Sequence, residues 1–192
     1  KIISAINNLE DTHYAITRLL CLENTHNRCY GSPISPQYFL NVKDAIKPYN
    51  LKLHIDGARI FNASVALNTN VKTLVEKADS ISCCLSKGLS CPSGSLVVGD
   101  KNLIKKGRRL RKMIGGGMRQ AGILAAAGIH ALDNMILRLE EDHDNAKELA
   151  ASVSKISSID IDVSKVSTNL IFFKLKNKKY SDEKFINELI KH

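Results

Sequence analysis

The stretch Ser80–Ser95, "SISCCLSKGLSCPSGS", decides how this chain is interpreted. It begins as an apolar, β-prone run and ends in small residues, two glycines and a proline. One lysine, Lys87, stands where the apolar run gives way to the turn residues. Because lysine is rarely buried without a reason, we predict a core strand over residues 80–85 that delivers a functional amine into a tight turn.

Three further runs have the composition of strands. They are residues 19–23 "LLCLE", 51–56 "LKLHID" and 95–98 "SLVV". Between the first two, residues 35–49 have a serine cap, a proline in the first turn and a helical apolar face, and residues 70–77 suit a second short helix. Strands that alternate with helices predict an α/β fold around a largely parallel sheet, with right-handed connections.

The chain changes character near Gly115. Residues 115–132, "GGGMRQAGILAAAGIHAL", predict a glycine turn and then an Ala-rich helix that we expect to be buried on most sides. A long amphipathic helix is expected to follow over residues 132–153, with His143 on its apolar face as a packed or rim residue.

The last part of the sequence has a different organisation. Two strands are predicted near 159–163 and 169–175, followed by a helix that Ser181 caps. We therefore expect residues 1–130 to be part of a large domain. Residues 131–192 are expected to be a linker helix and the start of a smaller α+β domain.

Composition bounds the class of protein. The chain has 192 residues, of which 44% are hydrophobic and 24% charged, as in a globular domain with a real core. No apolar run is long enough to span a bilayer, and the first residues lack the features of a signal peptide. The five cysteines have spacings that suit neither a disulfide framework nor a zinc site. We expect a cytoplasmic protein with reduced thiols and no membrane contact.

The net charge of +9 is concentrated in Lys105–Lys112, "KKGRRLRK". One interpretation is a contact with phosphate or nucleic acid. The other is a solvated helix surface with Ile104, Leu110 and Met113 as its apolar contacts. No aromatic residue interleaves the charges, so nucleic-acid binding is the less favoured of the two.

Chemically capable side chains follow the first three predicted strands. His26 comes after the first, Asp56 and Arg59 come at the end of the second, and Ser86 and Lys87 come at the end of the third. Ligands of open parallel sheets bind at the carboxyl ends of the strands, so these side chains are expected to converge on one crevice.

This set suits a pyridine cofactor that carries an aldehyde and a phosphate. Lys87 can form a Schiff base, and Asp56 can keep a ring nitrogen protonated so that the ring withdraws electrons from Cα of an amino acid. Ser86 can donate to the phosphate, and Arg59 can grip a substrate carboxylate. Each residue also has a plainer interpretation. Asp56 can be a turn residue, Arg59 a surface cation or the ion-pair partner of Asp56, Lys87 a snorkelling side chain, and His26 a turn cap.

Four motifs, "ENTHN", "LHIDGARIFNA", "LSKGL" and "GGGMRQAGILAAAG", together resemble the threonine aldolases. These are pyridoxal-phosphate lyases with the aspartate-aminotransferase fold, fold type I, in the β-eliminating lyase and threonine aldolase family. The matching motifs lie within residues 19–150.

The resemblance implies a role for each candidate residue. Lys87 would carry the cofactor, Asp56 would pair with the pyridinium nitrogen, and Ser86 would bind cofactor. Arg59 would bind the substrate carboxylate, and His26 would act near the β-hydroxyl. Two basic residues match neighbours of the family's active site that reach across a subunit interface: Arg119 on the cofactor side and Lys112 on the substrate side.

The activity implied is cleavage of L-threonine or L-allo-threonine to glycine and acetaldehyde by a homodimer or homotetramer. The alternatives are another pyridoxal-phosphate β-eliminating lyase, an aminotransferase, or a truncated product without catalytic activity. The chain lacks an initiator methionine, and the family's amino-terminal phosphate loop and late substrate arginine have no counterpart in it. We therefore expect a fragment of a longer enzyme.

Overall fold

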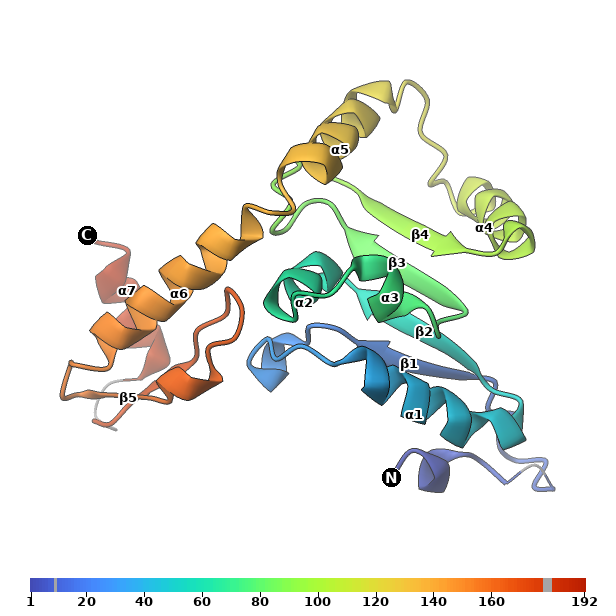
Figure 1. Cartoon of the computed structure of the whole chain (residues 1–192), viewed down its shortest axis with the longest axis horizontal. Helices are drawn as coiled ribbons and strands as arrows, with labels where there is room; N and C mark the ends of the chain where they lie inside the picture. The colour runs from blue at the N-terminus through green and yellow to red at the C-terminus, as the bar shows by residue number, and fades with distance from the viewer. Residues whose placement is uncertain (9, 178–180) are drawn as a thin grey trace.

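A computed structural model describes residues 1–8, 10–177 and 181–192. It contains a four-stranded sheet in the order β1–β2–β3–β4 and a two-stranded sheet, β5–β6 (Figure 1). Strands β1, β2 and β3 are parallel, and β4 returns antiparallel to β3. The predicted α/β fold with a largely parallel sheet is confirmed. The strands are β1 (Leu19–Glu23), β2 (Lys52–Gly57), β3 (Ser80–Cys84), β4 (Ser95–Gly99), β5 (Ile159–Ile161) and β6 (Phe173–Leu175).

Helices connect the strands as the sequence predicts, with one addition. The segment α2 begins directly after Arg59, which provides no side-chain cap, and so it carries no start signal that sequence reasoning detects. By contrast, α1 begins where Ser35 Oγ accepts the Tyr38 N–H at 3.3 Å. The helices are α1 (Pro36–Ile46), α2 (Ile60–Ala66), α3 (Val71–Val75), α4 (Lys101–Met113), α5 (Gly122–Asn134), α6 (Leu139–Val153) and α7 (Asp182–Leu189).

The two faces of the large sheet have different surroundings. On β2, Leu53 and Ile55 are fully buried, whereas Asp56 is exposed. Helices α1, α2 and α3 cover the face that holds Leu53, and their apolar residues form the main core with it (Figure 1). Because side chains alternate along a strand, the strand register places Glu23, Asp56 and Ser82 together on the other, open face.

An ion pair fastens the amino end of the sheet. Asp79, just before β3, accepts the Leu53 N–H at 2.8 Å and pairs with Lys43 of α1 and with Lys52 Nζ at 3.3 Å. Burial alone would raise the pKa of Asp79, but the hydrogen bonds from Lys43, Leu53 and Lys52 outweigh it and hold that pKa below its ordinary value. The carboxylate thus joins α1, β2 and β3.

Asp79→Asn is expected to lower the free energy of unfolding at pH 7 by roughly 1–2 kcal/mol, because the amide loses the charge that both lysines face. The folded pKa of Asp79 lies below the unfolded value of about 3.9, so its stabilisation is full above that value and is lost as pH falls through the folded pKa. Urea unfolding should show that the difference in unfolding free energy between the wild type and Asp79→Asn is smaller near pH 3 than at pH 7. Asp44→Asn, on an exposed part of α1, is the control. An Asp79→Asn protein as stable as the wild type at pH 7 would contradict the assignment.

Strand β4 forms one edge of the sheet, and all five of its residues are exposed. Leu96, Val97 and Val98 are 39%, 62% and 49% exposed. Helix α4 begins right after this strand, where Asp100 Oδ1 accepts the N–H groups of Asn102 and Leu103 at 2.7 and 2.9 Å.

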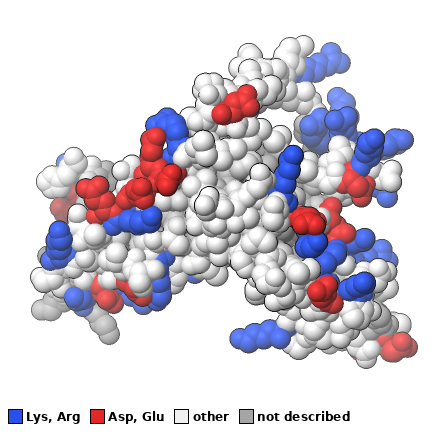
Figure 2. Space-filling view, in the orientation of Figure 1, with Lys and Arg blue, Asp and Glu red and all other residues white. Residues whose placement is uncertain are grey.

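The basic run lies on α4 and is exposed along its length, so its two interpretations, a solvated surface and a contact with phosphate or nucleic acid, both stay predictions. Figure 2 shows lysine and arginine side chains gathered over α4, and acidic side chains along α6. The apolar contacts expected there were only partly right. Ile104 is half-buried, but Leu110 and Met113 are 57% and 71% exposed.

The predicted Ala-rich and amphipathic helices differ from the structure in two ways. The helix predicted over residues 132–153 begins only at Leu139, because the chain turns over residues 135–138, and α5 and α6 meet there at 72°. The expectation that α5 is buried on most sides is wrong, because Ile123 and Ile129 are exposed and only Gly128 and Ala131 on this helix are buried. Only the side of α5 that holds Gly128 and Ala131 is buried by the rest of the described chain. The composition of the helix does not show what contacts its other sides.

The last third of the chain forms a small unit around α6. Ala146 and Ala150 of α6 pack on Val166, and β5 and β6 are shorter than the predicted strands. Thr168 Oγ1 donates to the Gly31 carbonyl at 2.9 Å, so this unit is fastened to the loop that follows β1. The domain boundary near residue 130 stays a prediction.

Within the described residues, no single helix has the length and apolar character needed to cross a membrane. The bent pair α5–α6 meets that test only by the length and composition of the two helices together.

Candidate active site

Three strands end at one edge of the large sheet. The register pairs Glu23 of β1 with Asp56 of β2, and Asp56 with Ser82 of β3. The loops that follow these strands therefore start side by side, as predicted for the carboxyl edge of a parallel sheet (Figure 1). This edge carries five of the seven predicted site residues.

The loop after β1 holds His26 in a defined position. The fully buried side chain of Asn24 donates from Nδ2 to the Ile34 carbonyl and accepts the Ile34 N–H at Oδ1. The backbone N–H of Asn24 donates to the Asp56 carbonyl at 2.9 Å. His26 Nδ1 accepts the Arg28 N–H at 3.1 Å, and Nε2 lies 3.2 Å from Glu23 Oε2. Since a carboxylate only accepts, Nε2 carries the proton in this arrangement. His26 is a turn cap, as its plainer interpretation held, and it is also paired with an acid.

Asp56 and Arg59 lie at the junction of β2 and α2. Asp56 Oδ1 accepts the Ala58 N–H at 3.0 Å, which fixes the carboxylate in a turn while its side chain stays on the open face. Arg59 occupies the position before the first residue of α2 and is half-buried. No ion pair joins these two residues in the described part of the chain, where Asp56 Oδ1 accepts the Ala58 N–H instead.

The turn after β3 presents Ser86 and Lys87. Both are exposed, whereas Leu85 before them and Leu89 after them are buried. The Ser90 N–H donates to the Lys87 carbonyl at 2.8 Å, and the Cys91 N–H donates to the Leu85 carbonyl at 3.1 Å. The amine therefore projects from a short, internally bonded turn that two apolar side chains anchor.

Lys112 and Arg119 lie apart from this edge. Lys112 is in the last turn of α4, and Arg119 is in the connection from α4 to α5. Because β4 runs antiparallel, α4 starts at the opposite end of the sheet (Figure 1). Within one copy of the chain, the structure does not bring these two cations to His26, Asp56 and Lys87. Their contribution from a second subunit stays a prediction.

Sequence reasoning missed the partners that orient the site. Glu23 pairs with His26 three residues later, and the spacing Glu-x-x-His is a signal that could have found this pair. Asn62 of α2 and His143 of α6 are bonded through Asn62 Nδ2 and His143 Nε2 at 3.1 Å, and both are buried. The prediction that His143 is packed is confirmed, but no sequence pattern links positions 62 and 143.

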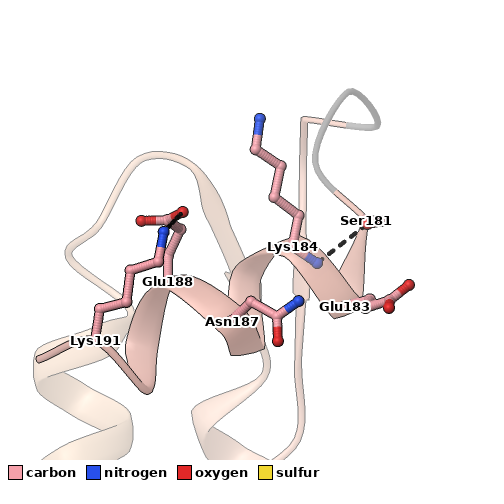
Figure 3. A pocket seen from close by; sticks show the side chains of 6 residues that line it. All are labelled: Ser181, Glu183, Lys184, Asn187, Glu188 and Lys191. Carbon is pink, nitrogen blue, oxygen red and sulfur yellow. Dashed lines mark hydrogen bonds and ion pairs between the residues drawn. The ribbon is translucent and has the colours of Figure 1, made fainter.

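The hollow in Figure 3 is a surface feature of α7 and not part of this edge. Its rim holds the Glu188–Lys191 ion pair at 2.7 Å, and Ser181 Oγ accepts the Lys184 N–H at 3.2 Å. None of the predicted site residues lines it.

Solved structures with a similar arrangement of strands and helices show the fold to which this chain belongs. The fold matches a threonine aldolase from Leishmania major with a TM-score of 0.67 at 20% identity, over 83% of this chain and 47% of that one. It matches a PLP-dependent aminotransferase from Streptococcus suis with a TM-score of 0.69 at 16% identity, over 92% of this chain and 47% of that one. The chain therefore has the aspartate-aminotransferase fold that the sequence predicts.

The particular family follows from sequence. The model of the beta-eliminating lyase family matches residues 1–177, and the chain belongs to that family. It is 48% identical to the low specificity L-threonine aldolase of Escherichia coli K12 over 166 residues, which are 86% of this chain and 48% of the relative. It is 46% identical to low-specificity L-threonine aldolase 1 of Arabidopsis thaliana over 166 residues, 86% of this chain and 46% of the relative. The chain thus spans about half the length of the curated relatives it matches.

Proposed function

We propose that the intact protein is a pyridoxal-phosphate-dependent aldehyde lyase that cleaves L-threonine or L-allo-threonine to glycine and acetaldehyde. One observation carries the proposal. Asp56 lies at the end of β2 and Lys87 in the turn after the neighbouring strand β3, in a chain that is 48% identical to a low specificity L-threonine aldolase.

The side chains at this edge fit the chemistry of the cofactor. Lys87 offers an amine for the aldehyde, Asp56 a carboxylate for the ring nitrogen, and Ser86 a hydroxyl for the phosphate. All three are exposed at the edge of the open face and are not covered by other parts of the described chain. When bound, the cofactor supplies an electron sink for the pair of electrons that Cα of the substrate retains.

Each residue has a defined task in this proposal. Lys87 holds the cofactor through Nζ and releases it when the substrate amine takes its place. The Asp56 carboxylate would accept a charge-assisted hydrogen bond from the protonated ring nitrogen and so keep the proton on that nitrogen, and the Ala58 N–H helps to orient the carboxylate. Arg59 binds the substrate carboxylate as a planar fork.

His26 is the proposed acceptor of the β-hydroxyl proton, directly or through water. Both of its ring nitrogens are engaged, Nδ1 by the Arg28 N–H and Nε2 by Glu23. Proton uptake at Nδ1 therefore requires the Arg28 contact to open. The Glu23 carboxylate then stabilises the imidazolium, so the proton is held until glycine is formed.

The proposed assembly is a homodimer or homotetramer in the cytoplasm. In it, Lys112 and Arg119 of one copy reach the site of another, on the substrate and cofactor sides. The position of α4 beyond the opposite end of the sheet supports this arrangement, because it removes both cations from the site of their own chain.

The decisive experiment combines cofactor trapping with product analysis on the intact protein. Pyridoxal phosphate should give a visible absorbance band that borohydride bleaches, and mass spectrometry should locate the reduced adduct on Lys87. L-Threonine should then yield equal amounts of acetaldehyde and glycine. Transfer of the amino group to a 2-oxo acid, or β-elimination without aldehyde release, would replace the proposal by another reaction of the same fold. A protein that takes up no cofactor and binds nucleic acid in a salt-sensitive way would be a non-catalytic product.

Asp56→Asn is expected to reduce threonine cleavage by about a hundredfold, because an amide does not stabilise the protonated ring nitrogen as a carboxylate does. The rate of acetaldehyde release at saturating threonine measures the effect, with Asp44→Asn on the exposed face of α1 as the matched control. Equal rates for the wild type and Asp56→Asn would remove Asp56 from the site.

A further inference from the structure

The turn that carries Lys87 rests on two helices that sequence reasoning did not connect with it. A Cβ atom placed on Gly88 would lie 2.7 Å from Leu139 Cδ2 and 3.1 Å from Asn62 Oδ1. Leu139 begins α6, and Asn62 lies in the first turn of α2. The backbone beside Lys87 is therefore in close contact with both helices, and a side chain at position 88 would push it away.

A buried hydrogen bond joins α2 and α6 at the place where the Lys87 turn contacts them. Asn62 and His143 are 2% and 3% exposed, and Asn62 Nδ2 lies 3.1 Å from His143 Nε2. His143 is one turn after Leu139 on α6, so the two side chains share one face of that helix, and His143 meets Asn62 of α2 from this face. The Asn62 side chain thus contacts the Gly88 backbone on one side and the imidazole on the other.

A neutral His143 can accept the hydrogen bond from Asn62. Burial lowers the pKa of His143, and Lys147 lowers it further, against the opposing effect of Asp142, Asp144 and Glu140 on the same helix. A neutral imidazole with a lone pair on Nε2 accepts the amide N–H of Asn62. Loss of this acceptor would leave a buried amide without its partner, which is costly in a protein interior.

The residues just before the helix that holds Asn62 form the other half of the site. Arg59 precedes the first residue of α2, and Asp56 lies three residues earlier. Through Asn62, the helix that directly follows Asp56 and Arg59 contacts the turn that positions Lys87. His143 fixes the orientation of the Asn62 amide from behind.

We propose that Asn62 and His143 are positioning residues that set the Lys87 turn against the Asp56–Arg59 junction. This inference rests on the proposed function for its catalytic meaning. The placement of the turn itself does not depend on any cofactor.

The test is made on the intact protein with His143→Leu, which keeps the volume of the side chain and removes the acceptor. Without cofactor, hydrogen exchange of the Ser90 and Cys91 amides should quicken about tenfold beyond what the variant's own unfolding free energy explains. With pyridoxal phosphate, the Kd from absorbance titration should rise about tenfold. His143→Gln, whose amide oxygen can accept from Asn62, should restore both values.

Ser64→Ala is the matched control. It lies on the same helix and loses a hydrogen bond to the Thr69 carbonyl at 2.6 Å, but at the end of α2 away from the turn. Its turn exchange and cofactor Kd should equal those of the wild type. If His143→Leu behaves like Ser64→Ala in both readouts, the proposal is overturned.

A second variant decides the case if His143→Leu does not fold. Gly88→Ala pushes on Leu139 and Asn62 from the turn side and should reproduce both tenfold changes. Wild-type exchange and Kd in this variant would refute the inference. A wild-type protein that takes up no pyridoxal phosphate would refute the proposed function alone, because the exchange readout still decides whether the pair positions the turn.

Discussion

Replacing Lys87 by alanine in the intact protein is expected to abolish the attachment of pyridoxal phosphate that borohydride reduces to a permanent bond, and to lower threonine cleavage to the background rate. No other described side chain presents an amine in the turn after β3, where Ser86 and Leu89 flank it. The alanine variant retains the backbone bonds of the turn, including the Ser90 N–H to the carbonyl of residue 87, and is expected to remain folded. The measurements are the absorbance band, the mass of the reduced protein and acetaldehyde release.

Two comparisons separate a catalytic amine from a merely basic residue. Lys72→Ala removes an exposed lysine from α3 and should change none of the three readouts. Added methylamine should partly restore threonine cleavage to the Lys87→Ala protein, because a free amine can replace the missing one. Unchanged activity in Lys87→Ala would end the assignment of this site.

Replacing Gly57 by alanine is expected to lower the free energy of unfolding by about 3 kcal/mol or more. A Cβ atom there would lie 2.8 Å from the Ser82 carbonyl oxygen and 2.9 Å from Ile60 Cβ. The carbonyl belongs to the neighbouring strand β3, whose pairing with β2 and β4 prevents it from retreating. The junction that presents Asp56 therefore depends on the absence of a side chain at position 57.

Urea unfolding compared with Gly107→Ala measures this effect. Gly107 lies inside α4, where no atom lies within 4 Å of an added Cβ. Alanine there should stabilise the helix by up to about 1 kcal/mol, since glycine is the poorer helix former. A Gly57→Ala protein as stable as the wild type would show that the β2–α2 junction is less crowded than the structure indicates.

The sheet and the strand ends were predictable because their signals are local. Apolar runs such as residues 51–56 and 80–85, separated by capped helices, specify parallel strands whose carboxyl ends share an edge. That rule alone placed His26, Asp56 and Lys87 in one neighbourhood. The prediction of the cofactor came from the resemblance of the glycine and lysine motifs to the threonine aldolases. Family membership confirms that resemblance.

The rest depended on contacts between positions far apart in the chain. The bond from Asn62 to His143 spans 81 residues, and the bond from Thr168 to Gly31 spans 137. The composition of α5 is that of a buried helix, yet Ile123 and Ile129 face solvent. Apolar composition indicates that a helix surface is stabilised by burial, but it does not show whether residues of the same chain bury it.

The exposed strand β4 leaves one edge of the described sheet open to a further strand. Its sequence, "SLVVG", carries no charge, and it forms an edge of the described sheet with backbone groups free of a further strand. Natural sheets usually guard such edges with lysines, prolines or bulges, because a flat apolar edge recruits strands from neighbouring molecules. In the described chain, β4 is therefore an edge at which a further strand can pair, directly after the turn that carries Lys87.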